Sequence, residues 1–295
     1  MKTVAILGPT GMLGNGVFCQ LRNKYKLILA LRDQKKITLL ENRYGPCENC
    51  KLIPFDSQAL YSDYAQGFHD HHASPSLSKF INDIGDVNAV INCIGITNRY
   101  SNDHPLDAFF INSAFPHILS NVYGRKLIHI TTDCVFSGKQ GAPYDENAVP
   151  SPNDLYGLSK SLGEPSQRSL VLRTSIIGHE VSGFVSLIEW FKKQEGKTVQ
   201  GYTTHLWNGI TTIEFGNICD KIISNRDEYP SNGLFHIFST DVTKYEMLQA
   251  FKKKYSVNVT IQPEEPDVVD RRLSTVFELC GKLKIPSFQK MLDAL

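Results

Sequence analysis

Residues 4–14 read VAILGPTGMLG, an apolar run that ends in a glycine-rich turn. Val4–Leu7 is short and continuously apolar, which is typical of a strand buried on both faces. Glycines follow at the spacing G-x-x-G-x-x-G from Gly8 to Gly14, and residues 12–24 carry apolar side chains at helical spacing. Such a turn lets the backbone approach a pyrophosphate, which the positive N-terminus of the helix attracts. The stretch predicts a dinucleotide-binding turn; the alternative is a plain strand-to-helix turn.

Further apolar runs continue this rhythm through the first 175 residues. The runs are Leu27–Leu31, Leu52–Phe55, Val87–Ile94, Lys126–Thr131 and Leu170–Leu172. Segments able to form helices lie between them, notably 106–123 and 155–163, and we expect one helix with loops within 56–86. Continuous apolar strands that alternate with helices predict a parallel sheet covered on both faces. The predicted fold class is therefore α/β, a Rossmann-like doubly wound parallel sheet.

The pattern changes after residue 175. The segments there are a predicted amphipathic helix at 184–194, an aperiodic stretch at 198–212, predicted helices at 213–224 and 245–255, short apolar runs at 234–238 and 257–261, and a helical C-terminal stretch. We predict a dinucleotide-binding domain over 1–175 and a smaller mixed α/β substrate lobe over 176–295. The chain is expected to return to the first domain around 202–226.

Composition restricts the class of partner. The chain has 295 residues, with 31 Lys and Arg against 30 Asp and Glu, so its formal charge is +1. Such a balanced charge gives no electrostatic reason to expect a nucleic acid as the main partner. No charge-free apolar run reaches about 18 residues, and the apolar start of the chain is too short for a signal peptide. We expect a cytoplasmic protein without a membrane partner.

Seven cysteines are scattered along a chain large enough to bury a core without covalent cross-links. We therefore expect reduced thiols. Cys47 and Cys50, with His69, His71 and His72 downstream, are zinc-ligand types, but their spacing fits no common zinc finger and a polar loop explains them. No metal site is predicted.

The residues after the second apolar run bear on the choice of cofactor. An acidic residue about 20 positions past the glycines would bind a ribose 2′-hydroxyl, whereas an arginine there suits a 2′-phosphate. Leu31 is followed by Arg32 and Asp33, with Lys35 and Lys36 close behind. This cluster favours NADP over NAD. The alternative is a solvated charge cluster in which Asp33 binds the ribose of NAD.

Two further motifs suggest carbonyl chemistry. Tyr156 and Lys160 are four residues apart on a predicted helix, which places both side chains on one face. An ammonium beside a phenol is expected to lower the phenol's pKa and to make it a useful proton donor. Thr131 and Thr132 follow a predicted parallel strand, at the sheet edge where ligands bind, and a Thr hydroxyl there can hydrogen-bond a substrate oxygen. Each motif alone also has an ordinary structural explanation.

In combination and order, these motifs resemble an extended short-chain dehydrogenase/reductase, and more narrowly the dTDP-4-dehydrorhamnose reductase family. That family pairs the glycine motif with S-T-D-Y-V-F-x-G, Y-G-x-x-K and R-T-S segments. The corresponding segments here are Thr131–Gly138, Tyr156–Lys160 and Arg173–Ser175. Residues 91–95 occupy the fourth-strand cofactor segment, and Asn112 matches the asparagine of the following helix. The resemblance covers most of residues 1–175.

The resemblance implies that Thr132, Tyr156 and Lys160 are catalytic. Hydride would pass from the nicotinamide to C4 of a 4-keto hexose on a nucleoside diphosphate, with Tyr156 as general acid and Lys160 also holding the nicotinamide ribose. The nucleotide sugar is the implied partner, and a homodimer is compatible with the resemblance. The expected cofactor contacts are Gly8, Thr10, Gly11, Met12, Leu13, Arg32, Asp56, Cys93, Gly95, Thr131, Tyr156 and Lys160.

The chain departs from the family pattern at two places. Cys134 stands where the family usually has Tyr, and Ile176–Ile177 stands where an aromatic often lines the sugar site. Arg271 and Arg272 either contact a diphosphate or form ion pairs. The alternative functions are a nucleotide-sugar epimerase or dehydratase, and a non-catalytic NADP-binding regulatory subunit of a partner enzyme.

Overall fold

The alternation of apolar runs and helical segments forms a seven-stranded sheet in the computed structural model, which describes residues 1–68 and 74–295. From one edge to the other the strands are β11 (Gly233–His236), β6 (Leu170–Arg173), β5 (Leu127–Thr131), β4 (Ala89–Asn92), β1 (Thr3–Leu7), β2 (Lys26–Leu31) and β3 (Cys50–Pro54). Every neighbouring pair is parallel. This is the doubly wound order, and it confirms the predicted Rossmann-like fold.

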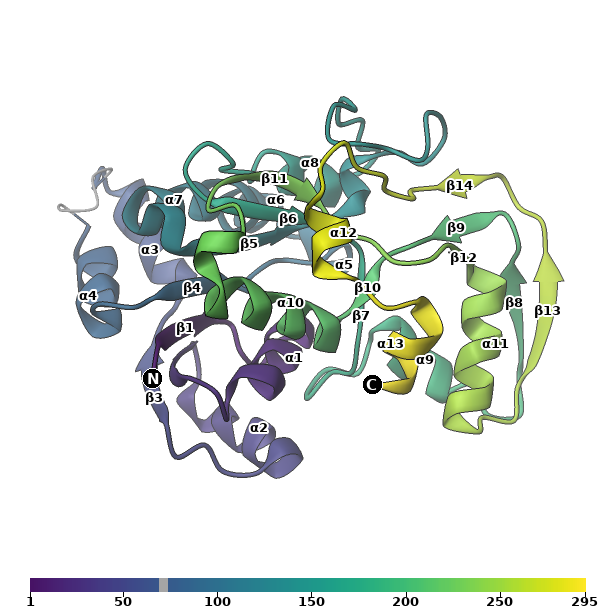
Figure 1. The fold of residues 1–295 in the computed structure, drawn as a ribbon, viewed down its shortest axis with the longest axis horizontal. Helices are drawn as coiled ribbons and strands as arrows, with labels where there is room; N and C mark the ends of the chain where they lie inside the picture. The colour runs from purple at the N-terminus through teal and green to yellow at the C-terminus, as the bar shows by residue number, and fades with distance from the viewer. Residues whose placement is uncertain (69–73) are drawn as a thin grey trace.

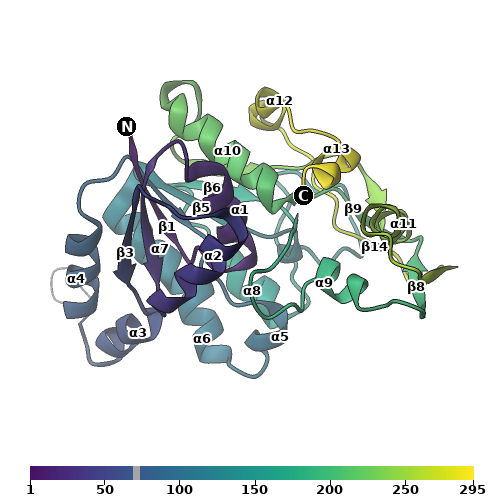
Figure 2. The same ribbon diagram turned by 90° about the horizontal axis from the view of Figure 1, so that it is seen from below.

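Both faces of this sheet are buried, as the continuous apolar strands predicted. Ile6 and Leu29 belong to one hydrophobic cluster, while their neighbours Leu7 and Ile28 belong to another on the opposite face. The first face is covered by α1 (Met12–Leu21), α2 (Ile37–Tyr44) and α10 (Thr212–Ser224). The second is covered by α3 (Ser57–Ala65), α4 (Pro75–Ile84) and α7 (Phe115–Tyr123) (Figures 1 and 2).

Helices α1 and α10 cross at close range because both carry glycine at the crossing. A Cβ atom at Gly16 would lie 2.6 Å from the carbonyl oxygen of Thr212, and one at Gly216 would lie 2.9 Å from the carbonyl oxygen of Gly16. Residues 212–236 thus pack on the dinucleotide-binding half through α10 and extend its sheet through β11. The predicted domain limits at residues 175 and 176 stay a prediction.

The remaining elements form a second, smaller mixed lobe. Its helices α9 (Leu187–Lys192), α11 (Lys244–Tyr255) and α13 (Phe288–Asp293) surround a separate hydrophobic cluster that includes Phe191 and Phe251. Its short sheets contain the strands β7 (Ile176–Ile177), β8 (Thr198–Tyr202), β9 (His205–Trp207), β10 (Ile210–Thr211), β12 (Val242–Thr243), β13 (Thr260–Glu264) and β14 (Val269–Asp270). Most of this lobe lies to the right of the sheet in Figure 1.

The short helices of the dinucleotide-binding half are α5 (Asn98–Ser101), α6 (Pro105–Phe109), α8 (Leu155–Ser161) and α12 (Leu279–Leu283). The first three contact one another, whereas α12 packs on the face of the sheet that α10 covers. The helix expected over 106–123 is present, but it contains a π-helical turn at Phe110–Ala114 between α6 and α7. Such turns are frequent at functional sites.

Three expectations about local structure were wrong. Residues 56–86 hold two helices, α3 and α4, because Asp56 and Ser74 each cap a separate N-terminus. The helix expected from residue 184 begins at Leu187, because Phe184 adopts a left-handed backbone with φ of 52°. The stretch at 198–212, expected to be aperiodic, forms three short strands.

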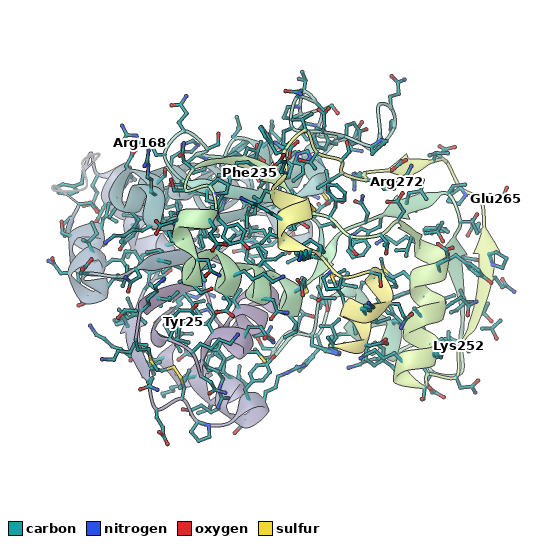
Figure 3. The ribbon with its side chains drawn as sticks, in the orientation of Figure 1. Tyr25, Arg168, Phe235, Lys252, Glu265 and Arg272 are labelled. Atoms are coloured by element: carbon teal, nitrogen blue, oxygen red, sulfur yellow. A yellow bond between two sulfur atoms is a disulfide. The ribbon has the colours of Figure 1, made fainter. Side chains whose placement is uncertain are left out.

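The expectation of reduced thiols is wrong for one pair. Cys47 and Cys50 form a disulfide between α2 and β3, drawn as a yellow bond in Figure 3. The histidines at 69, 71 and 72 lie outside the described residues. Within 1–68 and 74–295, no group of three His, Cys, Asp or Glu residues is arranged to hold a metal ion. No helix in the described parts of the chain is long and apolar enough to cross a membrane.

Candidate active site

The glycine turn places the N-terminus of α1 at the carboxyl end of β1. Gly8 has a φ of 72°, a backbone region that favours glycine. A Cβ atom at Gly14 would lie 2.1 Å from the carbonyl oxygen of Gly8, so the helix can pack onto the turn only without a side chain there. Gly11 caps the helix without a side-chain hydrogen bond. The first backbone N–H groups of α1, including that of Met12, are therefore available to an anion.

A cleft of about 410 Å³ runs beside this turn, across the carboxyl ends of β1, β2 and β4. Parallel strands leave such a crevice where the strand order reverses, here between β1 and β4. The residues lining it that were predicted to contact the cofactor are Gly8, Thr10, Arg32, Asp56 and Gly95. Lining residues that the sequence did not single out include Ile96, Thr97, Tyr100, Asp107 and Ile111. They come from α5, α6, the loop before them and the π-helical turn after α6, whose position only the fold reveals.

Charge at one end of the cleft suits a phosphate. Arg32 and Lys36 both line it, directly after β2. The carboxylate of Asp33 accepts a hydrogen bond from the backbone N–H of Lys35, at 3.0 Å from Oδ1. Asp33 therefore caps its own turn, which reduces its availability to a ribose hydroxyl. Asp56 similarly caps α3 by accepting from the N–H of Gln58, at 3.0 Å.

Three of the expected cofactor residues do not line the cleft itself. Leu13 is buried in the hydrophobic cluster under α1, so only its backbone can face a ligand. Cys93 follows β4, and burial raises the pKa of its thiol. The hydroxyl of Thr131, at the end of β5, is buried and has no hydrogen-bond partner within the described residues. Contacts of these three residues with a cofactor stay predictions.

Thr132 and Tyr156 meet because two segments pack closely. Thr132 caps the 3₁₀ turn after β5 and accepts a hydrogen bond from the N–H of Cys134, at 3.2 Å from Oγ1. A Cβ atom at Gly157 would lie 2.2 Å from the carbonyl oxygen of Cys134, so glycine lets α8 press against this turn. As a result the phenol of Tyr156 lies close enough to Thr132 for that hydroxyl to influence its pKa.

The phenol is protonated in this site. Burial raises the pKa of Tyr156, and the nearby Cys134 adds to that effect, while Thr132 opposes it. The expectation of a lowered pKa for Tyr156 is therefore wrong for this structure, because burial outweighs the groups that favour the phenolate.

Lys160 instead faces the floor of the cleft. Its Nζ donates to the carbonyl oxygen of Ile130, at 3.1 Å, and a Cβ atom at Gly95 would lie 3.8 Å from it. Burial lowers the pKa of Lys160 to about 8, although Glu164 and Cys93 oppose the shift. The amine is thus buried behind Gly95, which lines the cleft.

Asn112 holds the cleft wall against α8. Its Oδ1 accepts from the N–H of Ile96 at 2.9 Å, and its Nδ2 donates to the carbonyl oxygen of Ile96 and to Oγ of Ser159, each at 3.0 Å. Asn112 lies in the π-helical turn, which explains why this turn is irregular. Figure 2 shows α5, α6 and α8 side by side below the sheet.

A cluster of charges lies on the side of Thr132 that faces the second lobe. Burial raises the pKa of the Asp133 carboxyl, and Arg271 is the main opposing influence, with Lys244 weaker. Arg271 donates to the carbonyl oxygen of Phe136 at 3.0 Å and approaches Sγ of Cys134 at 3.8 Å. The Lys244 ammonium forms no hydrogen bond or ion pair with the described residues, and it lies 5.9 Å from the centre of the Trp207 ring. Lys244 lies in no recognisable motif, since its approach to Asp133 depends on packing between distant segments.

The arginine of the R-T-S segment lies outside this cluster. Arg173 is buried, with a bidentate ion pair to Glu164 at 3.0 and 2.6 Å and a contact to Nε2 of His236 at 2.9 Å. Its guanidinium also lies over the ring of Phe136, 5.1 Å from the centre. Arg173 therefore fastens β6, β11 and the loop after β5 together. Arg272 is likewise occupied, by Asp270 and Asp241 (Figure 3).

The chain matches one protein family and is similar to several known proteins. Residues 1–273 match the family described as the RmlD substrate binding domain. The Bacillus subtilis spore coat polysaccharide biosynthesis protein SpsK is 37% identical over 185 residues, which are 58% of this chain and 62% of SpsK. This chain thus spans less than two thirds of the length of SpsK.

Two further relatives cover most of the chain. The zebrafish (Danio rerio) methionine adenosyltransferase 2 subunit beta is 32% identical over 282 residues, which are 87% of this chain and 75% of that protein. The structure of a Bacillus anthracis dTDP-4-dehydrorhamnose reductase in complex with NADP superposes with a TM-score of 0.68, covering 99% of this chain and 98% of the other at 19% identity. The last likeness supports the fold.

Proposed function

The chain belongs to the RmlD substrate binding domain family, and on that premise we propose that it is an NADP-dependent reductase of the 4-keto group of a nucleotide-activated deoxy sugar. The observation that carries the proposal is the position of the protonated Tyr156 phenol beside Thr132, at the carboxyl end of β5. The amine of Lys160 lies behind Gly95, which lines the cleft at the strand ends. A protonated phenol beside a second hydroxyl can donate a proton to a carbonyl oxygen held there.

The cleft fits a dinucleotide. The exposed N–H groups at the start of α1 would hold the diphosphate, and Gly8 and Gly95 leave room for close approach of a ligand to the backbone. Arg32 and Lys36 would bind the adenosine 2′-phosphate, while NAD remains the alternative. Lys160 would hold the nicotinamide ribose. When bound, NADPH supplies the hydride.

Residues of this chain would donate the proton and position the keto oxygen that receives it. Because the pKa of Tyr156 is raised, the phenol stays protonated at neutral pH and can donate to the keto oxygen as negative charge develops there. Thr132 would hydrogen-bond the same oxygen and so fix its position beside Tyr156. Hydride added at carbon and a proton added at oxygen together convert the ketone to an alcohol. Tyr156 then recovers its proton from solvent.

The second lobe would bind the nucleotide sugar. Arg271 and Lys244 face the carboxylate of Asp133 and add one positive charge beyond it. This excess suits the diphosphate of the substrate. Cys134 leaves more space beside Tyr156 than the tyrosine that is usual in the family, which favours a sugar different from that of the rhamnose enzymes. A homodimer stays a prediction.

A non-catalytic NADP-binding subunit is the second candidate. It is favoured by the similarity to the zebrafish methionine adenosyltransferase 2 subunit beta, which covers more of this chain than the similarity to SpsK does. An epimerase or dehydratase is a further alternative within the enzymes. The pairing of Asp133 with Cys134, rather than with a second acid, disfavours dehydration.

Two measurements test the proposal. Native mass spectrometry of the purified protein should detect bound NADP, or bind added NADP⁺ at one site per chain. A spectrophotometric screen of NADPH consumption against several 4-keto nucleotide sugars should then find a substrate. Turnover with none of them, together with altered kinetics of a co-purifying enzyme, would support the regulatory subunit instead.

A further inference from the structure

A network of buried polar groups joins the glycine turn to the second lobe. It starts at Asn15, one turn into α1, which is only 1% exposed. The side-chain amide of Asn15 donates to the carbonyl oxygens of Gly11 at 2.9 Å, Met12 at 2.8 Å and His179 at 3.0 Å. Its Oδ1 accepts from the hydroxyl of Tyr44 at 2.8 Å. Both ends of the amide are occupied, so Asn15 is held in one orientation.

The imidazole of His179 extends this series of polar contacts into the second lobe. It follows β7, where the backbone leaves the dinucleotide-binding half. Nδ1 of its imidazole is 2.7 Å from Oε1 of Glu189 in α9, and Nε2 is 3.2 Å from the hydroxyl of Tyr255 at the end of α11. An ionised carboxylate only accepts, so Nδ1 donates to Glu189 and Nε2 accepts from Tyr255. Burial lowers the pKa of His179, which agrees with this neutral tautomer.

Two helices of the second lobe therefore converge on one imidazole. Glu189 lies in α9 and Tyr255 ends α11, and these helices enclose the hydrophobic cluster of that lobe. Lys192 strengthens the junction, because its ammonium lies 3.5 Å from Glu189 and 5.0 Å from the centre of the Tyr255 ring. None of these side chains lines the dinucleotide cleft. They can therefore affect a bound cofactor only through the residues that they contact.

We infer that His179 is a positioning residue, which holds the substrate lobe in register with the diphosphate turn through Asn15. The inference rests on the proposed function, in which the cofactor binds one lobe and the sugar is held by the other. Hydride transfer then requires the two lobes to keep a fixed relation, since small misplacements of reacting atoms are costly in rate. The side chain of Asn15 joins Gly11 and Met12 to the backbone carbonyl of His179, and the imidazole of His179 joins that segment to α9 and α11.

The first test compares two tyrosines. Tyr255→Phe deletes the hydroxyl that contacts His179 and keeps the ring. Tyr25→Phe is the matched control, because Tyr25 (labelled in Figure 3) bonds Asp220 of α10 at 2.7 Å, within the dinucleotide-binding half. Loss of one buried hydrogen bond should lower kcat of Tyr255→Phe roughly two- to tenfold, with the Kd of NADP⁺ unchanged. Tyr25→Phe should keep both values. An unchanged kcat in Tyr255→Phe, or an equal fall in both variants, would overturn the inference.

The second test needs no turnover. Saturation of the parent protein with NADP⁺ should slow amide hydrogen exchange in α9 (residues 187–192), and Tyr25→Phe should behave alike. In His179→Ala and in Tyr255→Phe this protection should be lost while NADP⁺ still binds. Binding without protection of α9 in the parent would overturn the inference and leave the proposed function intact. If the parent protein does not bind NADP⁺ when its Kd is measured, both the inference and the proposed function are contradicted.

Discussion

Thr132 donates a hydrogen bond to the buried carboxylate of Asp133, with Oγ1 and Oδ1 3.1 Å apart. Because Thr132 also contacts Tyr156, the carboxylate sets the orientation of the hydroxyl that would meet the substrate. The ionised form of Asp133 is itself unfavourable, since burial raises the pKa of its carboxyl. The site therefore keeps an acid that is unfavourable for folding at neutral pH.

Asp133→Asn should separate stability from activity. A folded-state pKa above the unfolded value means that ionised Asp133 weakens folding once the pH exceeds the unfolded value. The amide removes that penalty, so the free energy of unfolding at pH 7 should increase. Activity should fall roughly tenfold or more, because Thr132 loses a charged hydrogen-bond acceptor. Urea denaturation and steady-state kinetics measure the two effects. A variant that is less stable than the parent would contradict the assigned direction of the pKa shift.

Arg32→Ala should change cofactor preference. Loss of a charge-assisted contact to the 2′-phosphate should cost about 1.5–3 kcal/mol of NADPH binding, which is roughly ten- to hundredfold in Kd. NADH affinity should change little. Lys35→Ala is the matched control, since Lys35 is exposed and absent from the residues that line the cleft. Calorimetric titration with both cofactors gives the four affinities for each protein. Equal loss for NADPH and NADH would show that Arg32 does not read the 2′-phosphate.

The pH profile should report Lys160. Its pKa of about 8 lies below the ordinary 10.5, so the amine loses its charge as the pH rises through about 8. Since the pKa of Tyr156 is raised, the phenol stays protonated there and kcat/KM should fall through Lys160 alone. Lys160→Arg keeps a cation, so its remaining activity should lack this decline below pH 10. A decline at the same pH in both proteins would assign it to another group.

Arg173 should matter for folding more than for ligand contact. Removal of one partner from its buried ion pair with Glu164 should cost about 3–5 kcal/mol of unfolding free energy in Glu164→Ala. Lys79→Ala breaks an exposed helix pair with Asp83 and should cost less than about 1 kcal/mol. Equilibrium denaturation compares the two. Similar costs for the two variants would mean that the ion pair of Arg173 does not stabilise the contacts between β6, β11 and the loop after β5.

Local sequence was sufficient for the first half of the fold. Val4–Leu7 and the glycines that follow specify a strand, a turn and a helix from neighbouring residues, and the structure has these elements. The position of β11 was beyond such reasoning, because Gly233–His236 joins the sheet by pairing with β6, about 60 residues earlier. The Cys47–Cys50 disulfide was missed because composition favours reduced thiols in a chain of this size.

Prediction of the candidate site from local sequence was limited in the same way. Tyr156, Thr132 and Lys160 are recognisable from motifs, but burial raises the pKa of the phenol where the motif predicted a lowered one. Spacing of four residues places two side chains on one helix face, yet Lys160 extends to Ile130 instead. Lys244 and His179 carry no local pattern, since their roles come from contacts between distant segments. Their identification required the fold.

The most direct test is the activity of Tyr156→Phe. The variant keeps the ring and removes the oxygen that would donate the proton, so folding and NADP⁺ affinity should match the parent. The measurement is NADPH oxidation with the 4-keto nucleotide sugar that the parent protein reduces fastest. General acid catalysis is typically worth 10²–10⁴-fold, so kcat should fall by roughly that factor. Parent protein that binds NADPH but oxidises none of it with any such sugar, or a Tyr156→Phe variant with undiminished kcat, would contradict the account.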